Sequence, residues 1–211
     1  MTAPTSYLTV AHPARAETEV KRSRFRCRIE PVTTEEQARA VVDEERRRYW
    51  DARHHCSAFV LGSAAEVQRS NDDGEPSGTA GAPMLEVLRG RELSDVVAVV
   101  TRYFGGVLLG AGGLVRAYSD AVRAGLDEAG VRERRLLELY DVVVDHADAG
   151  RLEHALRGRD VVVLGVQYGA AATLRAAVPA DSADLLPAVL AELTGGTATA
   201  RPAGTAWVVA G

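Results

Sequence analysis

DVVAVVTRYFGGVLLGAGGLVRAYSDA, residues 95–121, decides the fold because it joins an apolar strand to an amphipathic helix through a glycine-dense loop. The nearly unbroken apolar run before the loop is typical of a buried central strand. After the loop, apolar and small residues recur at three- and four-residue spacing, which predicts a helix with one buried stripe. That stripe comprises Leu114, Tyr118, Ala121, Val122, Gly125, Leu126 and Ala129.

The loop between that strand and helix contains five glycines: Gly105, Gly106, Gly110, Gly112 and Gly113. A glycine-rich turn ahead of a helix is a common phosphate site. The named nucleotide motifs are absent, because the dinucleotide fingerprint would need glycine at Val115 and the P-loop would need lysine at Ala111.

Two interpretations of the glycine loop stay open. In the first, its glycines expose backbone N–H groups at the positive end of the helix, and Arg102 and Arg116 flank a bound anion. In the second, the glycines permit tight packing of the helix on the strand, while Tyr103, Phe104 and Tyr118 fill the core.

A second turn-dense loop, NDDGEPSGTAGAP at residues 71–83, contains three carboxylates: Asp72, Asp73 and Glu75. Calcium-loop spacing is absent because Gly74 comes too early. A turn capped by aspartate side chains is favoured over a magnesium site made with a ligand. Ser77 and Thr79 could supply hydroxyl donors to the same anion.

The stretch HHCSAFV raises the question of a nucleophile or a metal site. Alternate residues of a strand share a face, so only His54 and Cys56 lie together, and two ligands do not make a zinc site. A structural histidine pair is favoured, with no catalytic residue, no metal and no cofactor. Trp50 and Trp207 are expected to be core or edge-packing residues.

Composition is that of a globular protein, with 46% hydrophobic and 26% charged residues. No segment approaches the roughly 18 apolar residues that span a bilayer, and the first residues lack a secretory pattern. The two cysteines, Cys27 and Cys56, fit a reducing compartment. We therefore expect a cytoplasmic protein without membrane contact.

Charge is uneven along the chain. Residues 1–135 hold 20 basic and 20 acidic side chains, whereas residues 136–211 hold 5 and 9. Basic residues cluster at KRSRFRCR (21–28) and RRR (46–48), so a polyanion should meet the N-terminal half. The alternative is that the arginines alternate as one solvated face of a strand. These are Arg22, Arg24, Arg26 and Arg28.

The remaining patterns predict two α+β domains, 1–135 and 136–211, joined near Arg134 to Leu137. In the first, we expect a strand at 19–32, a helix from Thr33 to near Trp50, a hairpin of 54–62 with 67–70, and a short helix at 84–90. The second reads strand, helix, strand, strand, helix, strand, which is the ferredoxin-like βαββαβ order. We interpret it as a binding or positioning module.

Four stretches in this order, KRSRF, HHCSAFV, SNDDGEPSGTAGAPML and RYFGGVLLGAGGLVRAYSDA, closely resemble the YigZ/IMPACT family over residues 18–130. The resemblance implies two domains similar to the fourth and fifth domains of elongation factor G, the first also related to the second domain of a small-subunit ribosomal protein. The eukaryotic relatives regulate translation through a partner in the amino-acid starvation response. For the bacterial relatives, nucleic-acid or ribosome binding is the usual suggestion.

Three functions follow as hypotheses. The leading one is a non-enzymatic, translation-associated regulatory factor that binds RNA, the ribosome or a ribosome-bound partner, with the oligomeric state open and a monomer favoured. The second is an enzyme or small-ligand binder that uses the glycine-rich loops as a phosphate pocket, and the third is a protein-interaction scaffold. The expected anion or nucleic-acid site comprises Arg22, Arg24, His54, Asp72, Asp73, Glu75, Ser77, Thr79, Arg102, Gly105, Gly106, Gly110, Gly112, Gly113 and Arg116.

Overall fold

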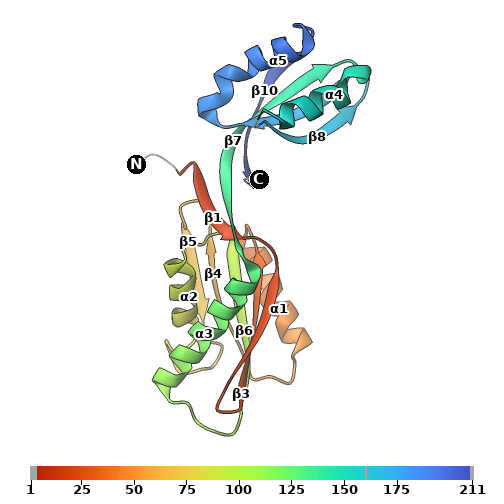
Figure 1. Cartoon of the computed structure of the whole chain (residues 1–211). Coiled ribbons are helices and arrows are strands. Elements are labelled where there is room, and N and C mark those ends of the chain that lie inside the picture. The colour runs from red at the N-terminus through yellow and green to blue at the C-terminus, as the bar shows by residue number, and fades with distance from the viewer. Residues whose placement is uncertain (1–3, 160, 210–211) are drawn as a thin grey trace. The chain divides into compact units, whose positions relative to one another are not determined.

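The computed structural model describes residues 4–159 and 161–209, and Figure 1 shows its elements. The chain divides into two compact units, Met1–Arg134 and Arg135–Gly211. Strand β7 (Val131–Val144) begins in the first unit and continues into the second. The joint expected near Arg134 to Leu137 therefore lies inside a strand rather than in a loop.

The first unit is built on one sheet with the strand order β2–β3–β6–β4–β5. The strands are β2 (Ala14–Val20), β3 (Ser23–Pro31), β6 (Val96–Tyr103), β4 (His54–Leu61) and β5 (Val67–Asn71), and neighbours run antiparallel. The central strand β6 is buried along almost its whole length, as its apolar sequence predicts. The hairpin of β4 and β5 is also confirmed.

Helices cover both faces of this sheet (Figure 1). Helices α2 (Gly81–Gly90) and α3 (Ala111–Ala129) pack on one face, where the main core contains Phe25, Met84 and Tyr118. Helix α1 (Glu35–Arg48) packs on the other face, over a smaller cluster. Close helix-on-strand packing depends on Gly125 of α3, because a Cβ there would lie 2.8 Å from Cys27 Sγ.

Helix α1 begins where the sequence predicts, with Thr34 as its N-cap. Its anchor is Glu45, which is 1% exposed and accepts hydrogen bonds from Arg15 and Arg28. Burial acts to raise the pKa of Glu45, but these two arginines outweigh burial and lower it. The ion pairs therefore tie α1 to β2 and β3.

The N-terminal strands differ from expectation. The strand expected over 19–32 is the end of β2, a turn at Lys21 and Arg22 with φ of 47° and 63°, and β3. Strand β1 (Ser6–Val10) was not predicted at all, and its Leu8 carbonyl accepts from Ser94 N at 2.9 Å. Sequence alone missed β1, which is only five residues long, and most of β2, whose apolar residues are few.

The second unit continues from β7 with α4 (His146–Arg157), β8 (Val162–Tyr168) and β9 (Ala172–Val178). A 3₁₀ turn (Ala180–Leu185), α5 (Leu186–Thr194) and β10 (Thr199–Val209) complete it. Strand β9 lies between β7 and β8, and β10 pairs with β7. The element order matches the predicted βαββαβ.

The second unit has a core of its own, which includes Leu152, Leu156 and Leu174. Its strand order supports the ferredoxin-like assignment, which stays a prediction, as does the likeness of the first unit to domain IV of elongation factor G. Among the described residues, no helix has the length and apolar character needed to cross a membrane.

Candidate functional site

One end of the first unit's sheet brings the sequence-predicted residues together. At this end β3 begins, β6 ends and β4 begins, so that Arg24 pairs with Tyr103 and His54 pairs with Arg102. The turn between β2 and β3, the loop after β5 and the glycine loop after β6 all meet there (Figure 1).

Asp72 organises the loop after β5. Its carboxylate accepts hydrogen bonds from the backbone N–H groups of Gly78, Ala80 and Gly81 at 2.8, 3.1 and 2.7 Å. Burial acts to raise the pKa of Asp72, but these three donors lower it overall. Both carboxylate oxygens thus serve the turn at the start of α2, as expected of an aspartate-capped turn.

Asp73 and His54 hold each other in place. The Asp73 carboxylate accepts from Arg46 at 2.6 Å and from the backbone N–H of His55 at 2.7 Å. His54 Nδ1 donates to the Asp73 carbonyl at 2.9 Å, which fixes a residue whose φ is 44°. His55 Nε2 lies 3.2 Å from the Tyr49 carbonyl, and burial lowers the pKa of this ring. Both imidazoles are therefore tied to backbone carbonyls.

A buried ion pair lies behind this loop. Glu75 Oε1 accepts from Arg102 Nη1 and from the Tyr118 hydroxyl, each at 2.7 Å. The Arg102 guanidinium lies 5.5 Å from the Phe25 ring centroid and 5.7 Å from that of Phe104. Arg102 is only 7% exposed, and its Nε is buried without a partner. Its charge is therefore largely matched within the protein.

Cys56 is a fully buried thiol in the same region. Its Sγ lies 3.0 Å from the Asp72 carbonyl and 3.3 Å from the Tyr118 hydroxyl. Burial raises the pKa of Cys56 to about 12. The thiol is thus protonated at neutral pH and donates a hydrogen bond, which does not support a role as nucleophile. In the described part of the chain, no group of three His, Cys, Asp or Glu side chains could hold a metal ion.

The glycine loop combines a packed start with an open end. A Cβ on Gly105 would lie 2.1 Å from the backbone carbon of Arg22, and Gly105 N donates to Ser23 Oγ at 3.0 Å. Gly106 and Gly110 have φ of 84° and 73°, and a Cβ on Gly112 would meet nothing within 4 Å. Close packing thus explains why residue 105 is a glycine, whereas a left-handed backbone conformation explains the glycines at 106 and 110.

The end of this loop leaves backbone donors unused. Gly110 is the N-cap of α3, whose first residue is Ala111, and it provides no side-chain cap. No described residue accepts a hydrogen bond from the backbone N–H groups of residues 106–113. An anion bound to these groups stays a prediction.

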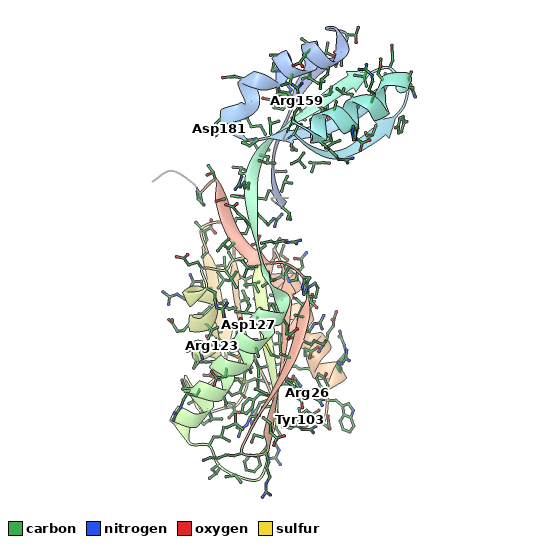
Figure 2. The ribbon with its side chains drawn as sticks, in the orientation of Figure 1. Arg26, Tyr103, Arg123, Asp127, Arg159 and Asp181 are labelled. Carbon is green, nitrogen blue, oxygen red and sulfur yellow. The ribbon has the colours of Figure 1, made fainter. Side chains whose placement is uncertain are left out.

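Arginines and aromatic rings cover the same end of the sheet on its α1 side. Arg24 lies 5.3 Å from the Tyr103 ring centroid, and Arg26 lies 5.1 Å from that of Tyr49. Arg48 lies 5.6 Å from the Tyr49 ring. Figure 2 shows Arg26 and Tyr103 close together. With Trp50, these residues form a surface that we call the basic–aromatic end: Arg24, Arg26, Arg48, Tyr49, Trp50 and Tyr103.

Trp50 is 83% exposed, so its expected place in the core or at a packed edge is wrong. It follows the last turn of α1, where the chain turns back toward β4. The stretch RRRYW, residues 46–50, contained the signal, because aromatic residues beside a basic cluster are typical of nucleic-acid surfaces.

Several cations around the basic–aromatic end form no ion pair with any described residue. They are Lys21, Arg22, Arg24, Arg48 and Arg53. Arg26, in contrast, pairs with Glu17 at 2.5 Å. Lys21 is the one lysine of the sequence, so this surface owes its charge almost wholly to guanidinium groups. The balanced charge of residues 1–135 therefore hides a local positive excess.

Both units of the chain resemble domains of known proteins. Residues 21–126 match the Impact N-terminal domain, and residues 142–197 match a domain of unknown function, DUF1949. The chain is 41% identical to the IMPACT family member YvyE of Bacillus subtilis, over 90% of this chain and 88% of that protein. It is 37% identical to the IMPACT family member YigZ of Escherichia coli, over 91% and 95%.

A solved structure gives a further match. It is described as the crystal structure of a hypothetical protein, with a TM-score of 0.64 and 36% identity, and the match covers 93% of this chain and 97% of that one. Together with the matches to both domains, this shows that the chain belongs to the IMPACT family.

Proposed function

We propose that this protein is a non-enzymatic, translation-associated factor that binds RNA through the basic–aromatic end, on the ribosome or beside a ribosome-bound partner in the cytoplasm. One observation carries the proposal. Arg24 and Arg48, which form no ion pair with a described residue, lie over the rings of Tyr103 and Tyr49, next to the exposed Trp50.

The chemistry of this surface fits single-stranded RNA. Bases stack on aromatic rings and on guanidinium planes, while phosphates pair with the arginine charges. Both kinds of interaction tolerate any sequence, because every base has a π-face and every nucleotide has a phosphate. The surface therefore suits a factor that attaches to exposed RNA without reading a fixed sequence.

The glycine loop extends the proposed site. The unused backbone N–H groups of residues 106–113 bind one phosphate, and Arg22 and Arg116 lie beside them. Ser77 is exposed and can donate, whereas Thr79 already donates to the Pro76 carbonyl at 2.6 Å. Asp72, Asp73 and Glu75 hold the frame around this phosphate and do not contact it. No magnesium ion is required in this arrangement.

The phosphate-pocket alternative would require Arg102 and Asp72 to face a ligand. Arg102 Nη1 instead donates to Glu75, and Asp72 accepts three backbone N–H groups. The scaffold alternative has one observation in its favour. On β8, Leu164 and Tyr168 are 46% and 65% exposed, which leaves an apolar surface for a protein partner.

Charge reversal tests the proposal. We expect the double variant Arg22→Glu and Arg24→Glu to lose most of its co-sedimentation with ribosomes and most of its affinity for a single-stranded RNA. The slope of log affinity against log salt should fall by about 0.7 for each phosphate that the variant no longer neutralises.

A matched control is the double variant Arg89→Glu and Arg123→Glu, which changes the net charge equally at exposed sites on α2 and α3. This control should bind nearly as well as the wild-type protein. If both double variants associate with ribosomes like the wild type, and the association does not respond to salt, RNA binding at this end is ruled out and the scaffold function remains.

A further inference from the structure

The glycine loop has exposed apolar side chains at Phe104, Val107 and Leu108, which we call its apolar tip. These side chains indicate the kind of RNA that binds, and this inference rests on the proposed function. We propose that Phe104 is a stacking platform for one unpaired base, and that Leu108 is a wedge inserted beside that base. The ligand is then RNA with a bulged or single-stranded nucleotide, rather than a continuous duplex.

Phe104 packs against a fixed side chain and is still more than half exposed. The Arg102 guanidinium lies 5.7 Å from its ring centroid, and Glu75 fixes that guanidinium at 2.7 Å. The Phe104 side chain is nevertheless 57% exposed. An aromatic ring that a neighbouring guanidinium supports and that remains largely exposed loses little entropy when a base stacks on it.

Leu108 is presented to solvent by the geometry of the loop. It is 82% exposed, and its neighbour Val107 is 41% exposed, whereas the next residue, Leu109, packs against the main core. Positive φ at Gly106 and Gly110 allows the chain to turn on both sides of this segment. Leu109 therefore anchors the loop, and Leu108 projects from it.

Charge identifies the occupant of this apolar tip. Between residues 102 and 119 the chain contains two arginines and no Asp or Glu. The turn of Lys21 and Arg22 lies against the start of the loop, because Gly105 N bonds to Ser23 Oγ. Apolar side chains surrounded by cations complement bases surrounded by phosphates, and apolar wedges in other proteins unstack base steps in this way.

Two RNA hairpins of equal length test the proposal with the full chain. One contains a single bulged 2-aminopurine, and the other is fully paired. The wild-type protein should bind the bulged hairpin more tightly and quench its fluorescence. Phe104→Ala should lose roughly 5- to 150-fold in affinity for the bulged hairpin, with the quenching abolished. Leu108→Ala should lose less, while Phe104→Trp should keep both affinity and quenching.

The control variant is Leu164→Ala, which removes an equally apolar exposed side chain from the second unit and should change the affinity for neither hairpin. Equal binding of both hairpins, with Phe104→Ala unchanged, overturns the stacking platform but leaves the proposed function intact. Failure of the wild type to bind any RNA overturns both. Loss of ribosome association in Phe104→Ala with unchanged RNA affinity overturns the proposal and assigns the tip to a protein partner.

Discussion

Glu75 shows at the scale of single residues how the sheet end is held. Its buried carboxylate accepts from both Arg102 and Tyr118, and Arg102 supports the ring of Phe104. Removal of one partner from a buried ion pair leaves the other charge without compensation. The residue is therefore a structural support for the site rather than a part of it.

We expect Glu75→Ala to lower the free energy of unfolding by about 3–5 kcal/mol, because the Arg102 guanidinium would remain buried and unpaired. Urea denaturation followed by circular dichroism measures the change. Glu86→Ala is the control, since Glu86 is an exposed residue of α2 and should cost less than about 1 kcal/mol. A Glu75→Ala protein as stable as the control would contradict this role.

The sequence revealed some of these residues and not others. The loop carboxylates stood out by composition, but their hydrogen bonds could not be read, because Asp72 bonds to N–H groups six to nine residues along the chain. Trp50 was misplaced because burial depends on tertiary contacts rather than on residue type. For the same reason, Phe104 is exposed, although one of the two interpretations of the glycine loop placed it in the core.

At the scale of elements, the sequence predicted α1, β6 and α3 from three different signals. These are a threonine cap with an acidic first turn in α1, an unbroken apolar run in β6 and an apolar stripe in α3. Helix α3 begins at Ala111, three residues ahead of the predicted apolar stripe, because Gly110 ends the loop as its N-cap. Strand β2 has alternating exposure, but its apolar residues are limited to Ala14, Ala16 and Val20, which left residues 14–18 without a clear signal.

The glycine loop should respond unevenly to alanine. Gly105→Ala should destabilise the protein by more than about 1 kcal/mol, since a Cβ there would lie 2.1 Å from backbone of the β2–β3 turn, which cannot shift cheaply. Gly112→Ala should leave stability unchanged or raise it by up to about 1 kcal/mol, because the position is helical and open. Thermal unfolding of both variants checks this, and equal losses would contradict it.

At the scale of the whole molecule, the two units have separate cores. The largest core of the first unit packs α2 and α3 on the sheet, and that of the second packs α4 and α5 on strands of its own. The domains predicted from sequence, 1–135 and 136–211, remain a proposal, because β7 passes through the boundary as one strand.

We expect calorimetry of the full chain to resolve two unfolding transitions, one for each core. Glu75→Ala should lower the midpoint of one transition and leave the other in place. A single transition that shifts as a whole would show that the two units unfold as one, and the boundary would then have no thermodynamic meaning.

The near absence of lysine at the basic–aromatic end has a consequence for regulation. Guanidinium groups keep their proton at any physiological pH, and they are not substrates for lysine acetylation. Enzymes that modify lysine would find only Lys21 among the side chains of this sequence. Attachment to RNA at this surface would then follow the ionic strength and magnesium content of the cell, rather than its acyl-donor supply or its pH.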